Sequence, residues 1–521
     1  MKLNFTITIL LLINIVSASA QIPCSLDNTF DNDGLLVSDG GRLGEYVIIQ
    51  SDGKILVGCN PFGNGDARIK RFNVDGSVDA TYGSGGSITI SIMEVATRIN
   101  GMVMYNNNIY ICGTTSTNIG GTNTYPYVAA ITPTGTFLTT FGTNGIKEFP
   151  SLYTCNAIAV DQVGNIFITG SSFFTSFYVM KLNNLGVPDI TFDTDGSATV
   201  ATGNNDHWFE TMDIKVDGNN KVIVSGRKEK ANNGSSIAAF RNTLVVRFNA
   251  NGSLDNSFAT GGIGLYNSAT GNYDEGMRIH VITGNEYIVT GSTYNNNDYD
   301  YTALKLKNNG TLNTAFGTAG WGIYDLTYNS EDEYSLNSEV LPDGRILITG
   351  NQGSGDTVHF CLLMVNSNGT RDNVFAPDGV FLNIFLQNNN SSSSGMDVDA
   401  TGKIVLAGYT RTCANGTCGP LSMALARYNN SFNSEGISDL TMENSFNLFP
   451  NPVMLNKNIS IKSDKNELLE AIQIFNSTGQ IQSVEMNRME NTFQLTAPVP
   501  GIYFCKIISD KGFSVLRFVI Q

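Results

Sequence analysis

The apolar residues of this chain recur in one pattern along most of its length. Seven times, a turn and a polar residue lead into a run of apolar or β-branched residues that closes on Gly, although Cys59 takes the glycine place in the first copy. A short apolar run bounded by turns predicts a buried β-strand. The copies begin 54, 57, 56, 65, 59 and 58 residues apart, at Lys54, Asn108, Asn165, Lys221, Glu286, Arg345 and Lys403.

A second pattern alternates with these strands. It is clearest over 247–258, where a turn at Asn251-Gly252 leads into Leu254-Asp255 and then Phe258. Glycine suits such a turn because it adopts positive φ at low steric cost. We expect the aromatic side chain to fill the space between neighbouring sheets. The other copies end at Tyr82, Phe141, Phe192, Phe316 and Phe375.

The two ends of the repeated region complete one another. The last strand copy, at Lys403, lacks the aromatic pattern, which occurs instead near the N-terminus as Ser-Leu-Asp-Asn-Thr-Phe over 25–30. A repeat of about 58 residues has room for four strands, and such sheets bury their faces by stacking on neighbours. We therefore predict an all-β fold in which residues 21–432 form a seven-bladed β-propeller closed by N- and C-terminal strands, with Phe30 in the blade of Ile404. An open β-solenoid is the alternative, but it gives no reason for the matched fragments.

The first twenty residues have the pattern of a secretory signal peptide. Lys2 precedes an apolar run over 7–16, and small residues over 17–20 place the cleavage after Ala20. The alternative, a transmembrane anchor, needs a longer run to span about 30 Å of hydrocarbon. We predict a signal peptide at 1–20 and no transmembrane anchor.

The composition changes after the repeats. A polar stretch predicts a linker at 433–445, and alternating apolar positions resume beyond it. Over residues 446–521 this alternation predicts a small immunoglobulin-like β-sandwich. Its expected strands lie at 459–461, 471–475, 493–495, 502–507 and 513–520.

Charge and cysteine content restrict the function classes. The chain has 31 Lys and Arg against 46 Asp and Glu, a net charge of −15, so we expect no binding to nucleic acid or to an anionic membrane surface. Its eight cysteines fit an oxidising compartment. Cys413 and Cys418 bracket a turn-forming Ala-Asn-Gly-Thr and are expected to form a disulfide. The alternative, a metal site, lacks a neighbouring His or a second Cys pair.

Residues suited to catalysis are scarce. The three histidines, His207, His280 and His359, lie outside metal-ligand spacing of one another. His207, beside Asp206 and Trp208, is the strongest candidate for a base at a propeller mouth. His359 suits the interior of a strand. The sequence contains no nucleophile elbow, phosphate loop or zinc-protease motif. We predict no catalytic residue, no bound metal and no cofactor.

Three kinds of loop offer other chemistry. Residues 31–34 and 193–196 resemble fragments of calcium loops, but the ligand series ending in Glu is missing, and a plain turn is the alternative. The insert 227–241 is a local cationic cluster that suits an anionic polymer or else a solvated loop. Residues 294–301 mix tyrosines with amides, which suits stacking on sugars or else a flexible hairpin tip.

The motifs resemble two known families. The strand Asp-Gly-Lys-Ile-Leu-Val over 52–57 and the segment Asn-Gly-Ser-Leu-Asp-Asn-Ser-Phe over 251–258 resemble the delta-60 repeat of bacterial propellers. That resemblance implies the fold and an extracellular context and carries no catalytic residues. The tail is similar to the C-terminal sorting domain of the Por (type IX) secretion system. The matching residues are Phe449, Pro450, Asn451 and Pro452, then Ile474, Phe475, Asn476 and Gly479, and finally Pro500, Gly501, Ile502, Tyr503 and Phe504.

The second resemblance implies export by the type IX machinery. We therefore expect a protein that is secreted or held at the outer cell surface. Its function is expected to be non-enzymatic binding or adhesion through inter-blade loops, with a glycan or a surface protein as partner. The alternatives are an extracellular polysaccharide-degrading enzyme with carboxylates at the propeller mouth and a purely structural surface component.

Overall fold

The computed structural model describes residues 24–430 and 446–520, apart from gaps at 93–94, 118–123, 174–175, 202–206, 233–234, 269–272, 296–297, 327–330, 354–357, 384–388, 415–416, 452, 455–456, 464–468, 477–480, 483, 488–490, 497–500 and 510–511. The predicted signal peptide with Ala20, the predicted linker 433–445, and Pro452, Gly479 and Pro500 lie outside the described residues. The chain divides into two units, 1–432 and 433–521.

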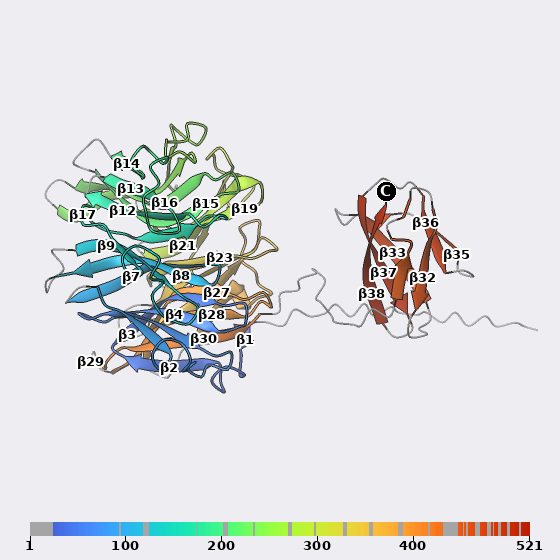
Figure 1. The fold of residues 1–521 in the computed structure, drawn as a ribbon, viewed down its shortest axis with the longest axis horizontal. Helices are drawn as coiled ribbons and strands as arrows, with labels where there is room; N and C mark the ends of the chain where they lie inside the picture. Colours follow the sequence, from blue (N-terminus) through green and yellow to red (C-terminus); the bar gives the residue numbers. More distant parts are fainter. Residues whose placement is uncertain are drawn as a thin grey trace, which may run out of the picture. The chain divides into compact units, whose positions relative to one another are not determined.

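The described part of the first unit is built from antiparallel sheets, six of four strands and one of six (Figure 1). Only two short 3₁₀ turns are described beside them, η1 (Thr283–Asn285) and η2 (Pro377–Gly379), and no described helix has the length and apolarity to cross a membrane. Six of the sheets consist of consecutive strands: β3 (Arg42–Ile49), β4 (Ile55–Pro61), β5 (Ala67–Phe72) and β6 (Ser87–Ile90); β7 (Ala96–Tyr105), β8 (Asn108–Ser116), β9 (Thr124–Ile131) and β10 (Ile146–Glu148); β11 (Ala157–Val160), β12 (Ile166–Phe173), β13 (Ser176–Leu182) and β14 (Ser197–Ala201); β15 (His207–Val216), β16 (Val222–Asn232), β17 (Ser235–Phe248) and β18 (Ile263–Tyr266); β19 (Asp274–Ile282), β20 (Glu286–Asn295), β21 (Asp298–Leu306) and β22 (Trp321–Tyr324); β23 (Glu333–Val340), β24 (Ile346–Gln352), β25 (His359–Val365) and β26 (Val380–Asn383).

A further sheet joins the two ends of this unit. It holds β27 (Asn389–Val398), β28 (Ile404–Ala414) and β30 (Ser422–Asn429), with β1 (Ser25–Leu26) and β2 (Leu35–Gly40) paired to β30 and β29 (Thr417–Cys418) paired to β28. Tyr428 lies opposite both Leu26 and Ile404. Phe30 is fully buried in a cluster that includes Val405 and Leu425. The first strands of successive sheets contact one another, and β27 contacts β3, so the arrangement is closed.

In five of the seven repeats, the glycine that ends the apolar run lies opposite a β-bulge in the inner strand. In the β15–β16 pair a β-bulge between Thr211 and Asp213 faces Gly226, and an added Cβ there would lie 2.0 Å from the Glu210 carbonyl oxygen. The glycine is therefore needed for close approach of two backbones. The same contact with a carbonyl oxygen of the inner strand, at 1.7 to 1.9 Å, is found for Gly113, Gly291, Gly350 and Gly408, and Gly170 makes it at 2.0 Å with the carbonyl oxygen of Thr154, which precedes β11.

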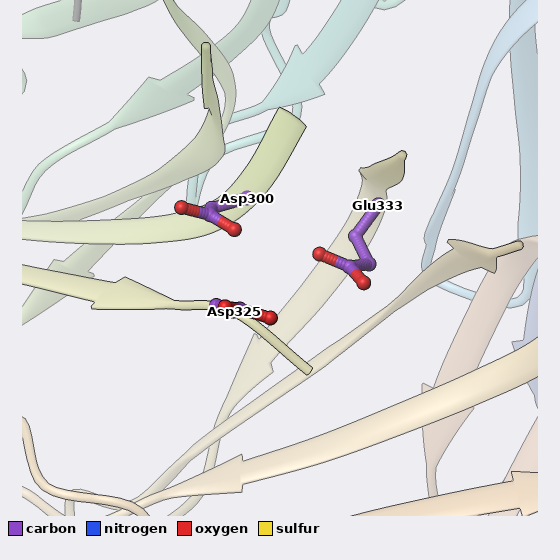
Figure 2. Close-up of side chains that lie close together, drawn as sticks. All are labelled: Asp300, Asp325 and Glu333. Carbon is purple, nitrogen blue, oxygen red and sulfur yellow. The ribbon is translucent and has the colours of Figure 1, made fainter. Parts of the chain in front are cut away.

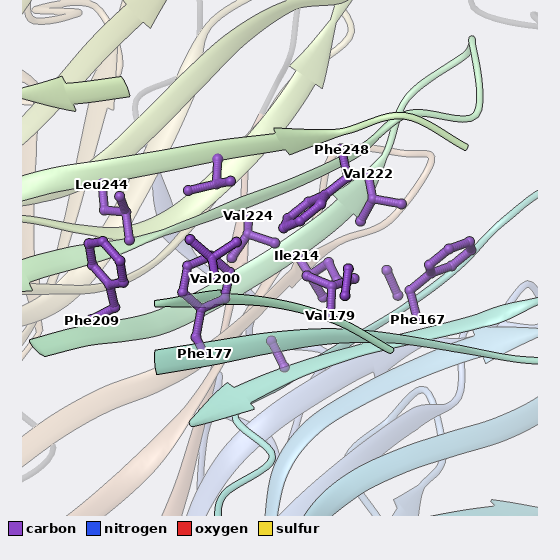
Figure 3. Packing of buried hydrophobic residues seen from close by; sticks show 14 of the residues in the cluster. Phe167, Phe177, Val179, Val200, Phe209, Ile214, Val222, Val224, Leu244 and Phe248 are labelled. Carbon is purple, nitrogen blue, oxygen red and sulfur yellow. The ribbon is translucent and has the colours of Figure 1, made fainter. Parts of the chain in front are cut away.

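The cores lie between neighbouring sheets. Figure 3 shows one of them, in which side chains of β12, β13 and β14 pack against those of β15, β16 and β17. Phe177 contacts Phe209 and Phe248 edge to face, with ring centroids 5.6 and 6.4 Å apart. As expected, the aromatic residue of the second pattern is buried in each copy: Phe30, Tyr82, Phe141, Phe192, Phe258, Phe316 and Phe375.

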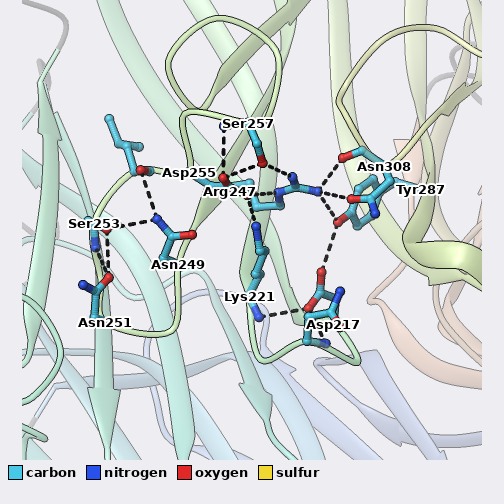
Figure 4. A network of polar contacts seen from close by, with 12 residues as sticks. Asp217, Lys221, Arg247, Asn249, Asn251, Ser253, Asp255, Ser257, Tyr287 and Asn308 are labelled. Carbon is cyan, nitrogen blue, oxygen red and sulfur yellow. Dashed lines mark hydrogen bonds and ion pairs between the residues drawn. The ribbon is translucent and has the colours of Figure 1, made fainter.

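The aspartate of the second pattern pairs with a cation of the first pattern and with an arginine that precedes the turn of its own pattern. Asp255 Oδ2 binds Lys221 Nζ at 2.5 Å and Arg247 Nε at 2.7 Å, and Arg247 is only 2 % exposed (Figure 4). Arg247 also donates to the hydroxyl of Tyr287 and the side-chain oxygen of Asn308, both in the next sheet. These contacts tie this repeat internally and to its neighbour. Equivalent pairs join Asp79 to Lys54 and Arg71, Asp372 to Arg345, and Asp27 to Lys403 and Arg427.

The second unit consists of two antiparallel sheets around one core. One sheet orders β31 (Phe446–Phe449), β32 (Ile459–Ser463), β36 (Thr492–Leu495) and β35 (Val484–Asn487), and the other orders β34 (Ile481–Gln482), β33 (Leu469–Asn476), β37 (Gly501–Ser509) and β38 (Gly512–Ile520). Buried Phe446 and Phe493 from the first sheet meet Ile474, Tyr503 and Phe518 from the second.

The described residues of the predicted sorting motif lie on both sheets of the second unit, with Ile474 and Tyr503 in its core. Phe449 ends the first strand and Pro450 follows it, Asn451 Oδ1 accepts the N–H of Val519 at 3.0 Å, and Gly501 begins β37. The predicted cysteine pair belongs to the first unit, where Cys413 and Cys418 face each other and their sulfur atoms are bonded.

Candidate functional site

The inner strands of neighbouring sheets bring charged side chains together. Beyond the bulges, β15 carries Asp213 and Lys215, β19 carries Arg278 and His280, and β23 carries Glu339. Residues two apart on a strand share a face. These five residues line a cavity of about 150 Å³. A second cavity of about 610 Å³ shares Lys215, His280 and Glu339 with it and opens beside η1.

The charges in this cavity are largely paired. Lys215 Nζ lies 3.0 Å from the Asp213 carboxylate, whose Oδ2 also accepts the N–H of Ile279. Arg278 Nε donates to the side-chain oxygen of Asn337 at 3.0 Å. His280 Nε2 lies 2.8 Å from the hydroxyl oxygen of Ser338.

Among the titratable groups that line this cavity, Glu339 has the pKa closest to neutral pH. Burial, reinforced by Asp397, raises the pKa of Glu339 to about 7. Burial also raises the pKa of Asp397 to about 6. Burial and the neighbouring Lys215 lower the pKa of His280 to about 3, so this imidazole is neutral at physiological pH. The cavity therefore offers one carboxyl group, that of Glu339, which exchanges a proton near pH 7.

Replacing Glu339 with Gln tests this assignment. The folded-state pKa lies above the unfolded value of about 4.3, so its stabilising contribution is present at low pH and is lost as pH rises through about 7. We expect the Tm of Glu339→Gln, relative to the native chain, to increase between pH 5 and pH 8. Glu148→Gln, at an exposed position, is the control. A constant Tm difference for Glu339→Gln across this range would contradict the assignment.

At the opposite end of the same strands, four tyrosines form a continuous row. Tyr273 precedes β19, Tyr294 and Tyr299 face each other across the β20–β21 hairpin, and Tyr334 lies on β23. Successive ring centroids are 5.9, 5.2 and 4.7 Å apart. Tyr294 is 36 % exposed and the other three are half-buried. We call these four residues the tyrosine row.

An ion network borders the tyrosine row. Arg227 bridges three carboxylates, at 2.6 Å from Glu210, 2.9 Å from Glu229 and 2.5 Å from Glu275. Arg241 pairs with Glu229 at 2.6 Å and lies 5.9 Å from the ring centroid of Tyr273. The row thus combines aromatic surface with fixed hydrogen-bonding groups.

On its other side the row meets three carboxylates that could hold a metal. Asp300 follows Tyr299 on β21, Asp325 follows β22, and Glu333 precedes Tyr334 on β23. One oxygen of each lies within 4.8 Å of the others, and Figure 2 shows the three side chains converging from separate strands. The donor set consists of oxygen alone.

The structure places the residues singled out from the sequence as follows. Segment 294–301 supplies half of the tyrosine row, whereas Tyr273 lies just before β19, Tyr334 lies on β23, and both carry no local signal. Arg227 and Arg241 of the cationic insert are neutralised by glutamates. The calcium-like fragments form turns, with positive φ at Asp31, Asn32, Gly34, Asp193, Thr194 and Gly196.

The three histidines have different positions in the fold. His280, which the sequence did not distinguish from the other two, lies in the cavity. The side chain of His207 lies outside the described residues. His359 begins β25, and burial lowers its pKa.

The fold and the tail together define the class of protein: an exported β-propeller with a C-terminal sorting domain. Residues 447–521 match the family described as "Secretion system C-terminal sorting domain". Residues 50–82, 219–258 and 341–375 match "Domain of unknown function (DUF5122) beta-propeller", and residues 150–177 match "Beta-propeller repeat".

The chain thus combines matches to β-propeller-repeat families with a Por secretion tail. Such a tail implies secretion by the type IX system and a cell-surface or secreted location. The predicted secretion tail and the predicted secreted or cell-surface location are confirmed, while the delta-60 name stays a resemblance. No curated protein matches the chain.

Several solved structures resemble the chain at low identity. An ulvan lyase of family PL25 bound to -[GlcA(1-4)Rha3S]- is 10 % identical, with 74 % of this chain and 94 % of that chain covered and a TM-score of 0.46. A GH43 β-1,3-galactosidase is 12 % identical, with 79 % and 94 % covered and a TM-score of 0.29. An exo-1,5-α-L-arabinanase from a bovine ruminal metagenomic library is 12 % identical, with 52 % and 97 % covered and a TM-score of 0.28. Likenesses of this degree say nothing about substrate.

Proposed function

We propose that this exported protein is a non-enzymatic binding module that recognises a glycan through the tyrosine row. The observation that carries the proposal is the contact of four partly exposed tyrosine rings on one face. Aromatic rings with a polar handle bury the apolar faces of sugars and leave hydroxyls to bond. The ion network around Arg227 and Arg241 supplies charged hydrogen-bonding groups beside the rings.

We propose the following organisation for the whole chain. A signal peptide at 1–20, cleaved after Ala20, precedes a seven-bladed propeller at 21–432. A linker at 433–445 leads to an immunoglobulin-like sorting domain at 446–521, which contacts the type IX machinery. The contact units at 1–432 and 433–521 and the sorting-domain match over 447–521 support these bounds.

Binding of the full chain to a glycan array tests the proposal. We expect saturable binding without new reducing ends. For a glycan that binds, Tyr294→Ala and Tyr299→Ala should each weaken the affinity at least about tenfold, because buried aromatic anchors carry much of the binding energy. Tyr153→Ala is the matched control, since Tyr153 is 39 % exposed and lies outside the row.

Two outcomes would contradict the proposal. Binding that survives both substitutions would place the glycan elsewhere. An absence of binding to any glycan would leave a protein partner or a purely structural role.

A second candidate, polysaccharide cleavage, is favoured by the raised pKa of Glu339, which lines the larger cavity. A carboxyl group with a pKa near 7 suits general acid or base catalysis. New reducing ends or unsaturated ends that form with the native chain and fail to form with Glu339→Gln would establish this function in place of the first.

A further inference from the structure

The three carboxylates beside the tyrosine row are brought together by tertiary structure alone. Asp300, Asp325 and Glu333 lie on three successive strand ends of two sheets (Figure 2). Asp300 is 1 % exposed and Glu333 is fully buried. Buried carboxylates within 4.8 Å of one another repel unless positive charge compensates them.

Asp300 has an unused ligand atom in this cluster. Its Oδ2 accepts a hydrogen bond from the side-chain amide of Asn295 at 2.8 Å. Its Oδ1 is buried and has no hydrogen-bond partner in the described part of the chain. A buried carboxylate oxygen without a partner is costly, and such an atom indicates an absent ion or water.

Among the described residues, Arg371 places positive charge near the cluster. Its Nη2 donates to the main-chain oxygen of Asp325, and its charge lowers the pKa of Asp300. Burial and the nearby Asp298 and Asp325 act more strongly, so the pKa of Asp300 is raised to about 6. One guanidinium therefore faces three carboxylates, and Asp298 adds a fourth nearby.

We propose that Asp300, Asp325 and Glu333 bind a divalent cation, Ca²⁺. Carboxylate oxygen is the ligand that Ca²⁺ prefers, whereas zinc sites draw on nitrogen and sulfur. Two oxygens that each lie about 2.4 Å from a Ca²⁺ ion are at most about 4.8 Å apart. The separation in the cluster meets this limit. The protein is exported, and extracellular Ca²⁺-binding modules have dissociation constants of about 10⁻⁴ to 10⁻³ M.

The ion would also set the geometry of the tyrosine row. Asp300 and Glu333 are the chain neighbours of Tyr299 and Tyr334, whose rings are 4.7 Å apart. A cation that joins β21 to β23 holds these rings at that separation. This consequence rests on the proposed function, whereas the binding of Ca²⁺ does not.

Calorimetric titration of CaCl₂ into the EDTA-treated full chain tests the site directly. We expect one Ca²⁺ at this site with a Kd of about 10⁻⁴ to 10⁻³ M, and weaker binding of Mg²⁺. At 10 mM Ca²⁺ the Tm should rise by a few degrees, on the order expected for a ligand that binds only the folded state. Asp300→Asn should weaken the affinity at least about tenfold. Asp378→Asn, at an exposed position, removes the same charge as a control.

Thermal unfolding in EDTA separates a metal site from an ion-pair network. If the carboxylates await a cation, Asp300→Asn relieves repulsion and is at least as stable as the native chain without Ca²⁺. A lower Tm of Asp300→Asn in EDTA, combined with no response of the native chain to Ca²⁺, would show that Arg371 alone compensates the cluster and would overturn the proposal. Equal Ca²⁺ affinity in both chains would overturn it as well. None of these readouts needs a glycan.

Discussion

Replacing Asp27 with Ala is expected to lower the free energy of unfolding of the first unit by about 3 to 5 kcal/mol, the usual cost of removing one partner from a buried ion pair. Asp27 is 2 % exposed, and its Oδ2 lies 2.6 Å from Lys403 Nζ and 2.7 Å from Arg427 Nε. Arg427 is itself buried and stacks over Phe30 at 4.8 Å. The substitution leaves Arg427 without its carboxylate in the sheet that joins the two ends of the unit.

Chemical denaturation of the full chain measures this loss, and Asp189→Ala is the matched control. Asp189 occupies the same place in an internal repeat, but its pair with Lys181 is partly exposed, at 23 % and 15 %. We expect a loss of about 1 kcal/mol or less there. Equal losses for the two variants would show that the closing sheet has no special role.

The ion pair of Asp27 with Lys403 and Arg427 also makes the stability of the first unit depend on pH in the acid range. Hydrogen bonds from Lys403 and Thr29 and the charge of Arg427 outweigh burial and lower the pKa of Asp27 well below its usual value. Its contribution is therefore present above an unfolded pKa of about 3.9 and is lost as pH falls below it. The stability difference between the native chain and Asp27→Ala should shrink below pH 4.

Replacing Gly291 with Ala is expected to cost about 3 kcal/mol or more. The new Cβ would lie 1.7 Å from the carbonyl oxygen of Glu275, a backbone atom that cannot rotate away. Overpacking usually costs about 1 to 3 kcal/mol when side chains can adjust, and here the inner strand β19 itself must move. Since Glu275 also pairs with Arg227, the ion network beside the tyrosine row should shift with it.

Gly218→Ala is the control for that experiment. The atom nearest to its added Cβ is the side-chain oxygen of Asn285, at 3.7 Å, and its φ is not positive. We expect a change within about 0.5 kcal/mol. The denaturation midpoints of Gly291→Ala and Gly218→Ala are measured and compared. Similar midpoints would mean that the inner strand adjusts freely and that the repeated glycine has another cause.

The repeated strand and aromatic patterns predicted the cores well because they are local. Apolar runs such as 55–57 and aromatics such as Phe258 are buried wherever the pattern occurs. The patterns also contained the ion pairs, since Lys221 and Asp255 belong to them, but their contact across 34 residues depends on how one sheet folds back on itself. The repeated glycine was visible in the sequence, but only the β-bulge on the opposite strand explained why a residue without a Cβ is needed there.

The candidate sites lay beyond such local signals. Tyr273 and Tyr334 are 61 residues apart and belong to different sheets, and neither differs in sequence from a tyrosine of the core. Alternation along a strand shows which residues share a face, but it does not show which neighbouring strand that face meets. For the same reason His280 and Glu339 gave no sign that they line one cavity.

By itself the sequence determined the all-β propeller repeats, the matched fragments at the two ends of the repeated region and the secretion tail, because these depend on strand periodicity and on motifs within single segments. Only the tertiary structure decided which carboxylates, tyrosines and arginines meet. Bulges in the inner strands and the stacking of neighbouring sheets bring those side chains together across repeats, and both depend on contacts between residues far apart in the chain.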